Sequence, residues 1–184
     1  SVMGRTGTGK SSFVNTATGS HLAVSSSLSS QTRTIQLSRP VKIDSKRVIL
    51  IDTPGLDMTT KSTEEVVRLV NAYLTKMRKR GTTVHGTIYL HRISDNRMGH
   101  IALESLVAFQ ELCAQEALTN IAIVLNMWED VCHNVRETRK DVLCTRKAYF
   151  KPIVDAGAVI FHHDRIASSA RDIIRHLVTR IPQP

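Results

Sequence analysis

The residues with the clearest chemical pattern stand near the start, where positions 4–11 read Gly4-Arg5-Thr6-Gly7-Thr8-Gly9-Lys10-Ser11. They match every fixed position of a phosphate-binding pattern: glycine, four residues, glycine, lysine, and serine or threonine. Glycine takes the positive φ angles that turn successive backbone N–H groups toward one point, where an anion can replace water. The sequence therefore predicts a phosphate-binding loop over residues 4–11.

The residues after this loop are expected to form a helix that completes the site. Three apolar residues recur at helical spacing before Gly19: Phe13, Val14 and Ala17. They predict a helix over 11–18, whose dipole would favour an anion in the loop. Lys10 is expected to reach the outer phosphates, and the Ser11 hydroxyl to bind Mg²⁺.

A second group of suitable residues, 52–55, follows the apolar run 47–51, which is typical of an interior strand. Such a strand brings Asp52 to the sheet edge where ligands of α/β proteins bind, so its carboxylate is expected to approach a metal. Gly55 would let a backbone N–H come close to a terminal phosphate. Residues 34–43 predict a preceding strand, pushed toward an edge by Pro40 and joined to 47–51 as a hairpin.

The rest of the chain alternates between strand and helix patterns, which indicates an α/β fold with a mostly parallel sheet. Further strands are expected at 84–90, 121–125 and 158–161. Helices are expected after the capping box 62–65 and over 101–116, 134–149 and 166–181.

Length and composition suit one globular domain over residues 1–184, with 41% hydrophobic residues to form its core. Only Ser1, Val2 and Met3 precede the loop, whereas a buried strand has about five or six residues. We therefore expect a truncated first strand in a piece of a longer protein.

The net charge of +9 raises nucleic acid or an acidic membrane as partners, but scattered basic residues and 4% aromatics make nucleic acid unlikely. No apolar run approaches the roughly 20 residues of a membrane helix. The three cysteines form no C-x-x-C pair, which argues against a disulfide framework. We expect a cytoplasmic protein with reduced thiols and no transmembrane segment.

Three signatures, 4–11, 52–55 and 126–129, lie in order at expected strand ends, and this order resembles the G domain of small GTPases over essentially the whole chain. More narrowly, the loop, the Ile51–Gly55 turn and the Tyr89–Met98 stretch resemble fungal G-domain proteins related to septins and to the GIMAP and Toc GTPases. The resemblance implies a three-layer P-loop NTPase fold, Ras-like, with one antiparallel edge strand in a mostly parallel central sheet.

The resemblance also implies GTP or GDP as the ligand, bound with Mg²⁺. It places the nucleotide against Gly4, Arg5, Thr6, Gly7, Thr8, Gly9, Lys10, Ser11, Ser12, Asn126, Met127, Glu129 and His162. It assigns Mg²⁺ to Ser11, Thr32 and Asp52, and catalytic roles to Lys10, Thr32 and Gly55. Thr34 is the alternative to Thr32, and the segments around Thr32 and Gly55 would be ordered by GTP.

The base-reading residues depart from the common pattern of Asn or Thr, Lys, any residue, and Asp. Met127 stands in place of the lysine, and Glu129 in place of the aspartate, with Asp130 as an alternative. Glu129 can still accept the ring N–H and amino hydrogens of guanine, so we expect a weakened guanine preference. A P-loop ATPase or kinase that uses the same loop is a further alternative. His162 and His163 take the place of a fifth motif, where they either flank the base or, as we expect, lie at the surface.

The residue after Gly55 is Leu56, where Ras-like enzymes have a water-orienting glutamine. We therefore expect slow hydrolysis of GTP to GDP and phosphate, with a non-catalytic, nucleotide-dependent oligomerisation module as the alternative. Acceleration could come from an effector protein or a nucleotide-dependent homodimer. Four arginines could supply a charge-stabilising group to such a contact: Arg5, Arg33, Arg92 and Arg97.

Overall fold

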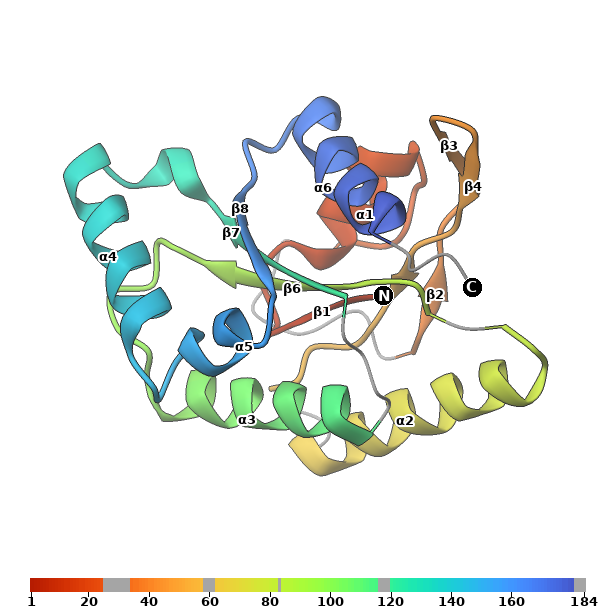
Figure 1. The fold of residues 1–184 in the computed structure, drawn as a ribbon, viewed down its shortest axis with the longest axis horizontal. Coiled ribbons are helices and arrows are strands. Elements are labelled where there is room, and N and C mark those ends of the chain that lie inside the picture. Colours follow the sequence, from red (N-terminus) through yellow and green to blue (C-terminus); the bar gives the residue numbers. More distant parts are fainter. Residues whose placement is uncertain (25–33, 58–61, 83, 116–119, 181–184) are drawn as a thin grey trace.

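The computed structural model describes residues 1–24, 34–57, 62–82, 84–115 and 120–180. Six strands form one central sheet in the order β2-β5-β1-β6-β7-β8, and helices lie on both of its faces (Figure 1). All neighbouring strands are parallel except the edge pair β2 and β5. The predicted three-layer α/β fold, with one antiparallel edge strand, is therefore confirmed. The strands of this sheet are β1 Val2–Gly4, β2 Gln36–Leu37, β5 Ile51–Asp52, β6 Thr87–Arg92, β7 Ile121–Asn126 and β8 Val159–His162.

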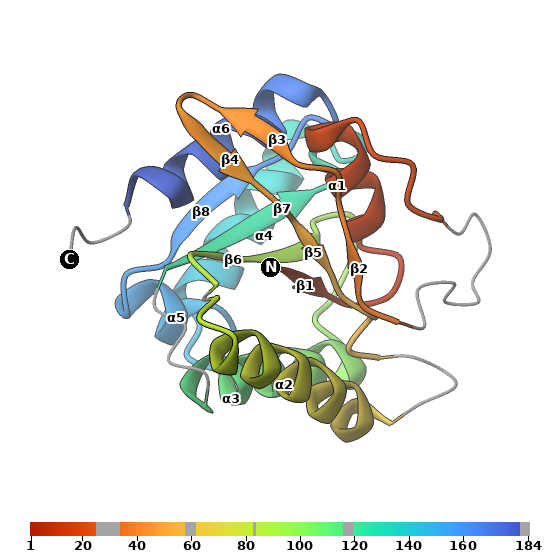
Figure 2. The same ribbon diagram turned by 90° about the vertical axis from the view of Figure 1, so that its right-hand side faces the viewer.

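The helices form two layers, which are seen most clearly from the side (Figure 2). Helices α1 (Lys10–Thr18) and α6 (Ala167–Thr179) cover one face, whereas α2 (Thr63–Lys79) and α3 (His100–Gln115) cover the other. A 3-10 turn η1 (Trp128–Asp130), α4 (His133–Thr145) and α5 (Lys151–Asp155) connect β7 to β8. None of the helices in the described part of the chain combines the length and apolarity that a membrane crossing requires.

Alternation along the strands divides the core into two clusters, one on each face of the sheet. Ile88 and Leu90 of β6 belong to the cluster that contains Phe13 of α1. Tyr89, between them, belongs to the opposite cluster and lies 4.5 Å, ring to ring, from Phe109 of α3. Side chains of a strand point alternately to opposite faces, so a sheet covered on both sides needs apolar residues at every position.

The two strands expected at 34–43 and 47–51 are each broken in the structure, which corrects the sequence prediction. The ends that face the turn at 44–45 form a separate hairpin of β3 (Val41–Ile43) and β4 (Lys46–Val48), as the sequence predicted for this turn. Pro40 lacks the N–H that a continuous ladder needs. Ile49 is 46% exposed between β4 and β5, so the run 47–51 is not one interior strand.

Two other expectations need smaller corrections. The helix expected over 134–149 ends at Thr145, because Arg146 is extended and Phe150 turns fully into the core. The strand expected over 84–90 runs from Thr87 to Arg92 instead. On α3, Val107 is half exposed, whereas Phe109 is buried.

Candidate nucleotide site

The loop between β1 and α1 has the backbone shape that its glycines predict. Gly4, Gly7 and Gly9 have φ angles of 138°, 74° and 90°. A Cβ atom on Gly4 would lie 2.4 Å from the carbonyl oxygen of Leu90, and one on Gly9 would lie 2.4 Å from Nδ2 of Asn126. Glycine is therefore required at both positions by conformation and by space.

Lys10, the first residue of α1, is buried beneath this loop. Its Nζ donates a hydrogen bond to the carbonyl oxygen of Arg5 at 2.7 Å. Burial lowers the pKa of Lys10 to about 8, against the opposing effects of the carboxylates of Asp52 and Asp57. The ammonium group is thus poorly hydrated, and a bound anion would stabilise its charged form.

Asp52, at the end of β5, lies beside Ser11, as the sequence predicts. The Ser11 hydroxyl donates a hydrogen bond to Oδ2 of Asp52 at 2.6 Å. Oδ1 of Asp52 is buried and has no hydrogen-bond partner in the described part of the chain. Burial raises the pKa of Asp52, although the Ser11 hydrogen bond and Lys10 lower it. A hydroxyl and an unpaired buried carboxylate oxygen are hard donors that fit Mg²⁺.

The residues around Gly55 pack closely against the phosphate-binding loop. A Cβ atom on Gly55 would lie 2.3 Å from Oγ1 and 2.7 Å from the backbone nitrogen of Thr6. The N–H of Leu56 donates to the carbonyl oxygen of Gly4 at 3.2 Å, and the Leu56 side chain is fully buried. Thr32 and Arg33 lie outside the described residues, and Thr34 is exposed.

Asn126 ends β7 and ties this strand to the loop. Its Nδ2 donates to the carbonyl oxygen of Thr8 at 2.8 Å, and its side chain is buried. Met127, next in the chain, has a φ of 59°, and the Ser94 hydroxyl donates to its sulfur at 3.5 Å. The structure therefore brings the expected base-reading segment against the loop through Asn126.

Trp128 is the centre of a cluster beyond Met127. The His162 ring stacks on it with centroids 5.1 Å apart and planes 22° apart, and the Arg136 guanidinium lies 5.1 Å from its centroid. Nη1 of Arg136 also donates to Oε1 of Glu129 at 3.1 Å. Trp128 is buried, whereas Glu129 is exposed, and Asp130 pairs with Arg165.

The expectation that both histidines 162 and 163 lie at the surface is wrong for His163. This ring is 2% exposed and meets Phe13 edge-on, with centroids 5.0 Å apart. Its Nδ1 shares a 2.7 Å hydrogen bond with the Ser169 hydroxyl. Burial lowers the pKa of His163 to about 4, so it is a neutral core residue, while the side chain of His162 is 58% exposed.

The sequence prediction missed the carboxylates that surround the loop. Asp57 accepts hydrogen bonds from Nε of Arg5 at 2.9 Å and from the backbone N–H of Thr6 at 2.5 Å. Asp95 pairs with Arg5 at 3.2 Å and with Arg92 at 2.9 Å. The only signal in the sequence was that both aspartates lie next to motifs, one after Gly55 and the other in the 89–98 stretch.

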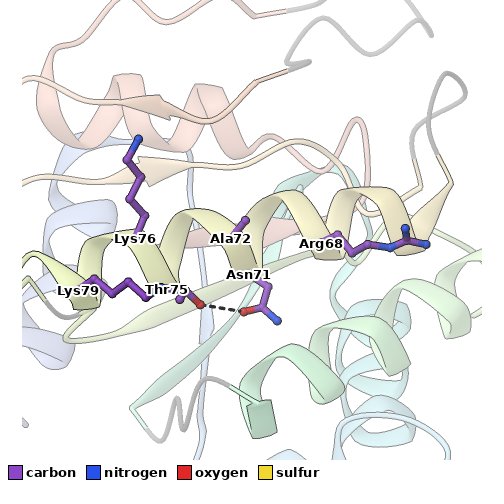
Figure 3. A pocket seen from close by; sticks show the side chains of 6 residues that line it. All are labelled: Arg68, Asn71, Ala72, Thr75, Lys76 and Lys79. Carbon is purple, nitrogen blue, oxygen red and sulfur yellow. Dashed lines mark hydrogen bonds between the residues drawn. The ribbon is translucent and has the colours of Figure 1, made fainter.

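A surface hollow of about 520 Å³ lies away from the loop, along the outside of α2, and Figure 3 shows its six lining side chains, all from that helix. Its hydrogen bond, from Oγ1 of Thr75 to Oδ1 of Asn71, stays within the helix. This hollow contains none of the predicted site residues.

Known proteins with similar structures share this arrangement of strands and helices. Toc33 from Arabidopsis thaliana in complex with GDP and Mg²⁺ aligns with a TM-score of 0.69 and 18% identity, over 96% of this chain and 80% of that one. The same protein with Mg²⁺ and GMPPNP gives 0.70 and 17%, over 98% and 84%. A third structure comes from work on the chloroplast translocon components atToc33 and psToc159, for whose GTPase activity dimerization is stated to be important. It aligns with a TM-score of 0.74 and 16% identity, over 100% of this chain and 82% of that one. At these identities the likeness shows the fold.

Sequence comparison gives the family. GTP-binding protein A of Dictyostelium discoideum is 28% identical over 152 residues, which are 80% of this chain and 33% of that protein. The chain thus spans about a third of that relative. Residues 1–127 match the sequence model of a family described as 50S ribosome-binding GTPase. The chain therefore belongs to this family of P-loop GTPases, and its fold is that of a G domain.

Proposed function

We propose that this G domain binds GTP and GDP with Mg²⁺ at the loop 4–11 and hydrolyses GTP slowly. The observation that carries the proposal is the meeting of three segments at one sheet edge. The loop, the end of β5 with Asp52, and the turn at Gly55 contact one another through Ser11 and Thr6. The backbone N–H groups of the loop suit a triphosphate, and the oxygens of Ser11 and Asp52 suit its cation.

The proposed roles follow from the position of each group. The loop N–H groups and the Lys10 ammonium would hold the phosphates, and Ser12 would add its N–H at the helix start. Ser11 and Asp52 would hold Mg²⁺, together with Thr32. The metal would supply a positive charge that neutralises the phosphate oxygens. Gly55 would sense the γ-phosphate, because its backbone lies against Thr6.

For the base, we propose recognition by the segment that follows β7. Asn126 holds the loop through Thr8, Met127 would cover the base, and Glu129 would accept its N–H groups. His162 is exposed at the end of β8 and would lie at the rim of this site. Because Glu129 also pairs with Arg136, we expect guanine to be preferred over adenine less strictly than in GTPases with an aspartate there.

The proposed slow rate rests on Leu56. Its side chain is buried and apolar, so it cannot orient a water for attack. Preorganised polar groups supply most of the catalysis in phosphoryl transfer, and the loss of one lowers the rate by orders of magnitude. We propose that a second copy of the chain or an effector supplies the missing group; dimerization is stated to matter for the GTPase activity of the Toc33 relatives.

A titration with a fluorescent GTP analogue tests the binding proposal. Wild type is expected to bind it in the presence of Mg²⁺, and Lys10→Ala to bind at least tenfold more weakly, because a charge-assisted contact is lost. Lys151→Ala, which removes a surface ion pair with Asp155, is the control and should bind like wild type. Equal affinity of wild type and Lys10→Ala would count decisively against the proposal.

The second candidate, a nucleotide-dependent assembly module without catalysis, is also motivated by buried Leu56. It is distinguished by measuring phosphate release from GTP at several protein concentrations. Release that Asp52→Ala abolishes would exclude the module, whereas binding and dimerization without release would support it.

A further inference from the structure

The Asp57 carboxylate, which belongs to the turn after Gly55, lies against the phosphate-binding loop. Oδ1 accepts the Thr6 N–H at 2.5 Å, and Oδ2 accepts Nε of Arg5 at 2.9 Å. The side chain is only 8% exposed. Both oxygens of a nearly buried anion are therefore paired with donors of the loop.

The Thr6 N–H belongs to the backbone groups that would hold the phosphates. Thr6 is in the middle of the phosphate-binding pattern, and Gly55, the expected γ-phosphate sensor, lies against its backbone nitrogen. The Asp57 carboxylate is also close enough to Lys10 to raise the pKa of that ammonium group. Asp57 therefore places a negative charge among an N–H group, a guanidinium and an ammonium.

The carboxylate is one end of a longer series of ion pairs. Arg5 pairs with Asp95 as well as Asp57, and Asp95 pairs with Arg92 at the end of β6. Residues from the loop, the Gly55 turn and the β6–α3 connection are thereby joined. Displacing Asp57 would release Arg5 from one partner while the other still holds it.

We propose that Asp57 acts as an internal competitor of the γ-phosphate and sets the preference of the site between nucleoside triphosphate and diphosphate. This inference rests on the proposed function. A γ-phosphate at the Thr6 N–H would repel the carboxylate at close range, so a triphosphate displaces the carboxylate, whereas a diphosphate leaves it in place. Displacement breaks the contacts of the Asp57 carboxylate with Thr6 and Arg5, while Arg5 stays paired with Asp95.

The experiment compares affinities for GDP and for a non-hydrolysable GTP analogue, both with Mg²⁺. In Asp57→Asn, which keeps the shape and removes the charge, the ratio of triphosphate to diphosphate affinity should rise roughly tenfold, as expected for a lost charged hydrogen bond. In Asp57→Ala the ratio should rise further. Asp155→Asn removes a carboxylate from an exposed ion pair on α5 and should leave the ratio unchanged.

A ratio that stays the same or falls in both Asp57 variants overturns the inference while leaving nucleotide binding intact. A wild type that binds neither nucleotide overturns the proposed function itself, so the two failures are distinguishable. Equal gains in affinity for both nucleotides would show only a general electrostatic effect and would also overturn the inference.

A second measurement needs no variant. The side-chain carboxylate of Asp57 in wild type is followed by carbon-13 NMR with GDP and then with the GTP analogue. Its chemical shift should change between the two complexes, because the carboxylate leaves Thr6 and Arg5 only in the second. An unchanged shift would contradict the competition.

Discussion

At the scale of single residues, two charged groups of the site are buried in the protein itself, Lys10 and Asp52. Lys10 is 6% exposed and Asp52 is fully buried. Burial lowers the pKa of Lys10 and raises the pKa of Asp52, which favours the neutral form of each. Bound phosphate would raise the pKa of Lys10 again, and a bound cation would lower the pKa of Asp52. Each residue therefore ties nucleotide or metal binding to protonation.

Lys10 predicts that affinity for GDP depends on pH. The ammonium carries its charge below a pKa of about 8 and loses it as the pH rises through that value, so affinity should fall above pH 8. Because bound phosphate favours the charged form, binding near pH 9 should take up as much as about one proton. Calorimetry in two buffers of different ionisation enthalpy measures this uptake. Lys10→Arg, which stays charged, should show none.

The Asp52 carboxylate leads to a prediction about how Mg²⁺ contributes to GDP affinity. Asp52→Asn keeps the hydrogen bond from Ser11 but removes the charge that faces the cation. Mg²⁺ should increase the GDP affinity of wild type, and this increase should be largely lost in the variant. Affinities measured with Mg²⁺ and with EDTA test this. An undiminished Mg²⁺ effect would show that Asp52 does not take part in holding the metal.

At the scale of elements, short local motifs determine where the site-bearing segments begin. Helix α1 starts where the glycine-rich loop ends and stops at Gly19, whose φ is 68°. Helix α2 starts at a complete capping box, in which Ser62 accepts the Glu65 N–H and Glu65 accepts the Ser62 N–H. These interactions depend on residues three or four apart, so they can be predicted from sequence.

The capping box predicts the stability of α2. Ser62→Ala removes the side-chain acceptor of the first turn and should lower the free energy of unfolding by about 1 kcal/mol. Urea denaturation measures the loss. Ser62→Asp supplies another acceptor at the same position and should retain most of the stability. A loss of equal size in both variants would contradict the capping explanation.

At the scale of the whole molecule, two clusters of apolar side chains hold the sheet between its helical layers. The cluster on the α2 and α3 face includes Phe109, which is fully buried and packs on Tyr89. Because the carboxyl ends of β1, β5 and β7 carry the site, its geometry depends on this packing. That residues 1–184 form one domain in the cytoplasm stays a prediction.

Phe109→Ala should destabilise the fold by about 3–5 kcal/mol, since a buried aromatic ring is replaced by a cavity. GDP with Mg²⁺ at about 100 times its dissociation constant should restore about 2.7 kcal/mol, because it binds only the folded state. Thermal unfolding with and without nucleotide measures both effects. Val107→Ala, on the exposed side of α3, is the control and should change stability by less than about 0.5 kcal/mol.

The sequence by itself determined the features that depend on neighbouring residues: the loop 4–11, the strand–helix alternation, the capping box and Asp52 at a strand end. Only the tertiary structure decided which residues meet across the chain. Asp57 lies 52 positions from Arg5, and Asp95 lies 90 positions from it, so no local spacing relates them. His162 and His163 are adjacent and chemically alike, yet only His163 is buried, because it faces Phe13 of α1. Packing between distant elements creates such contacts, and local sequence carries no direct record of it.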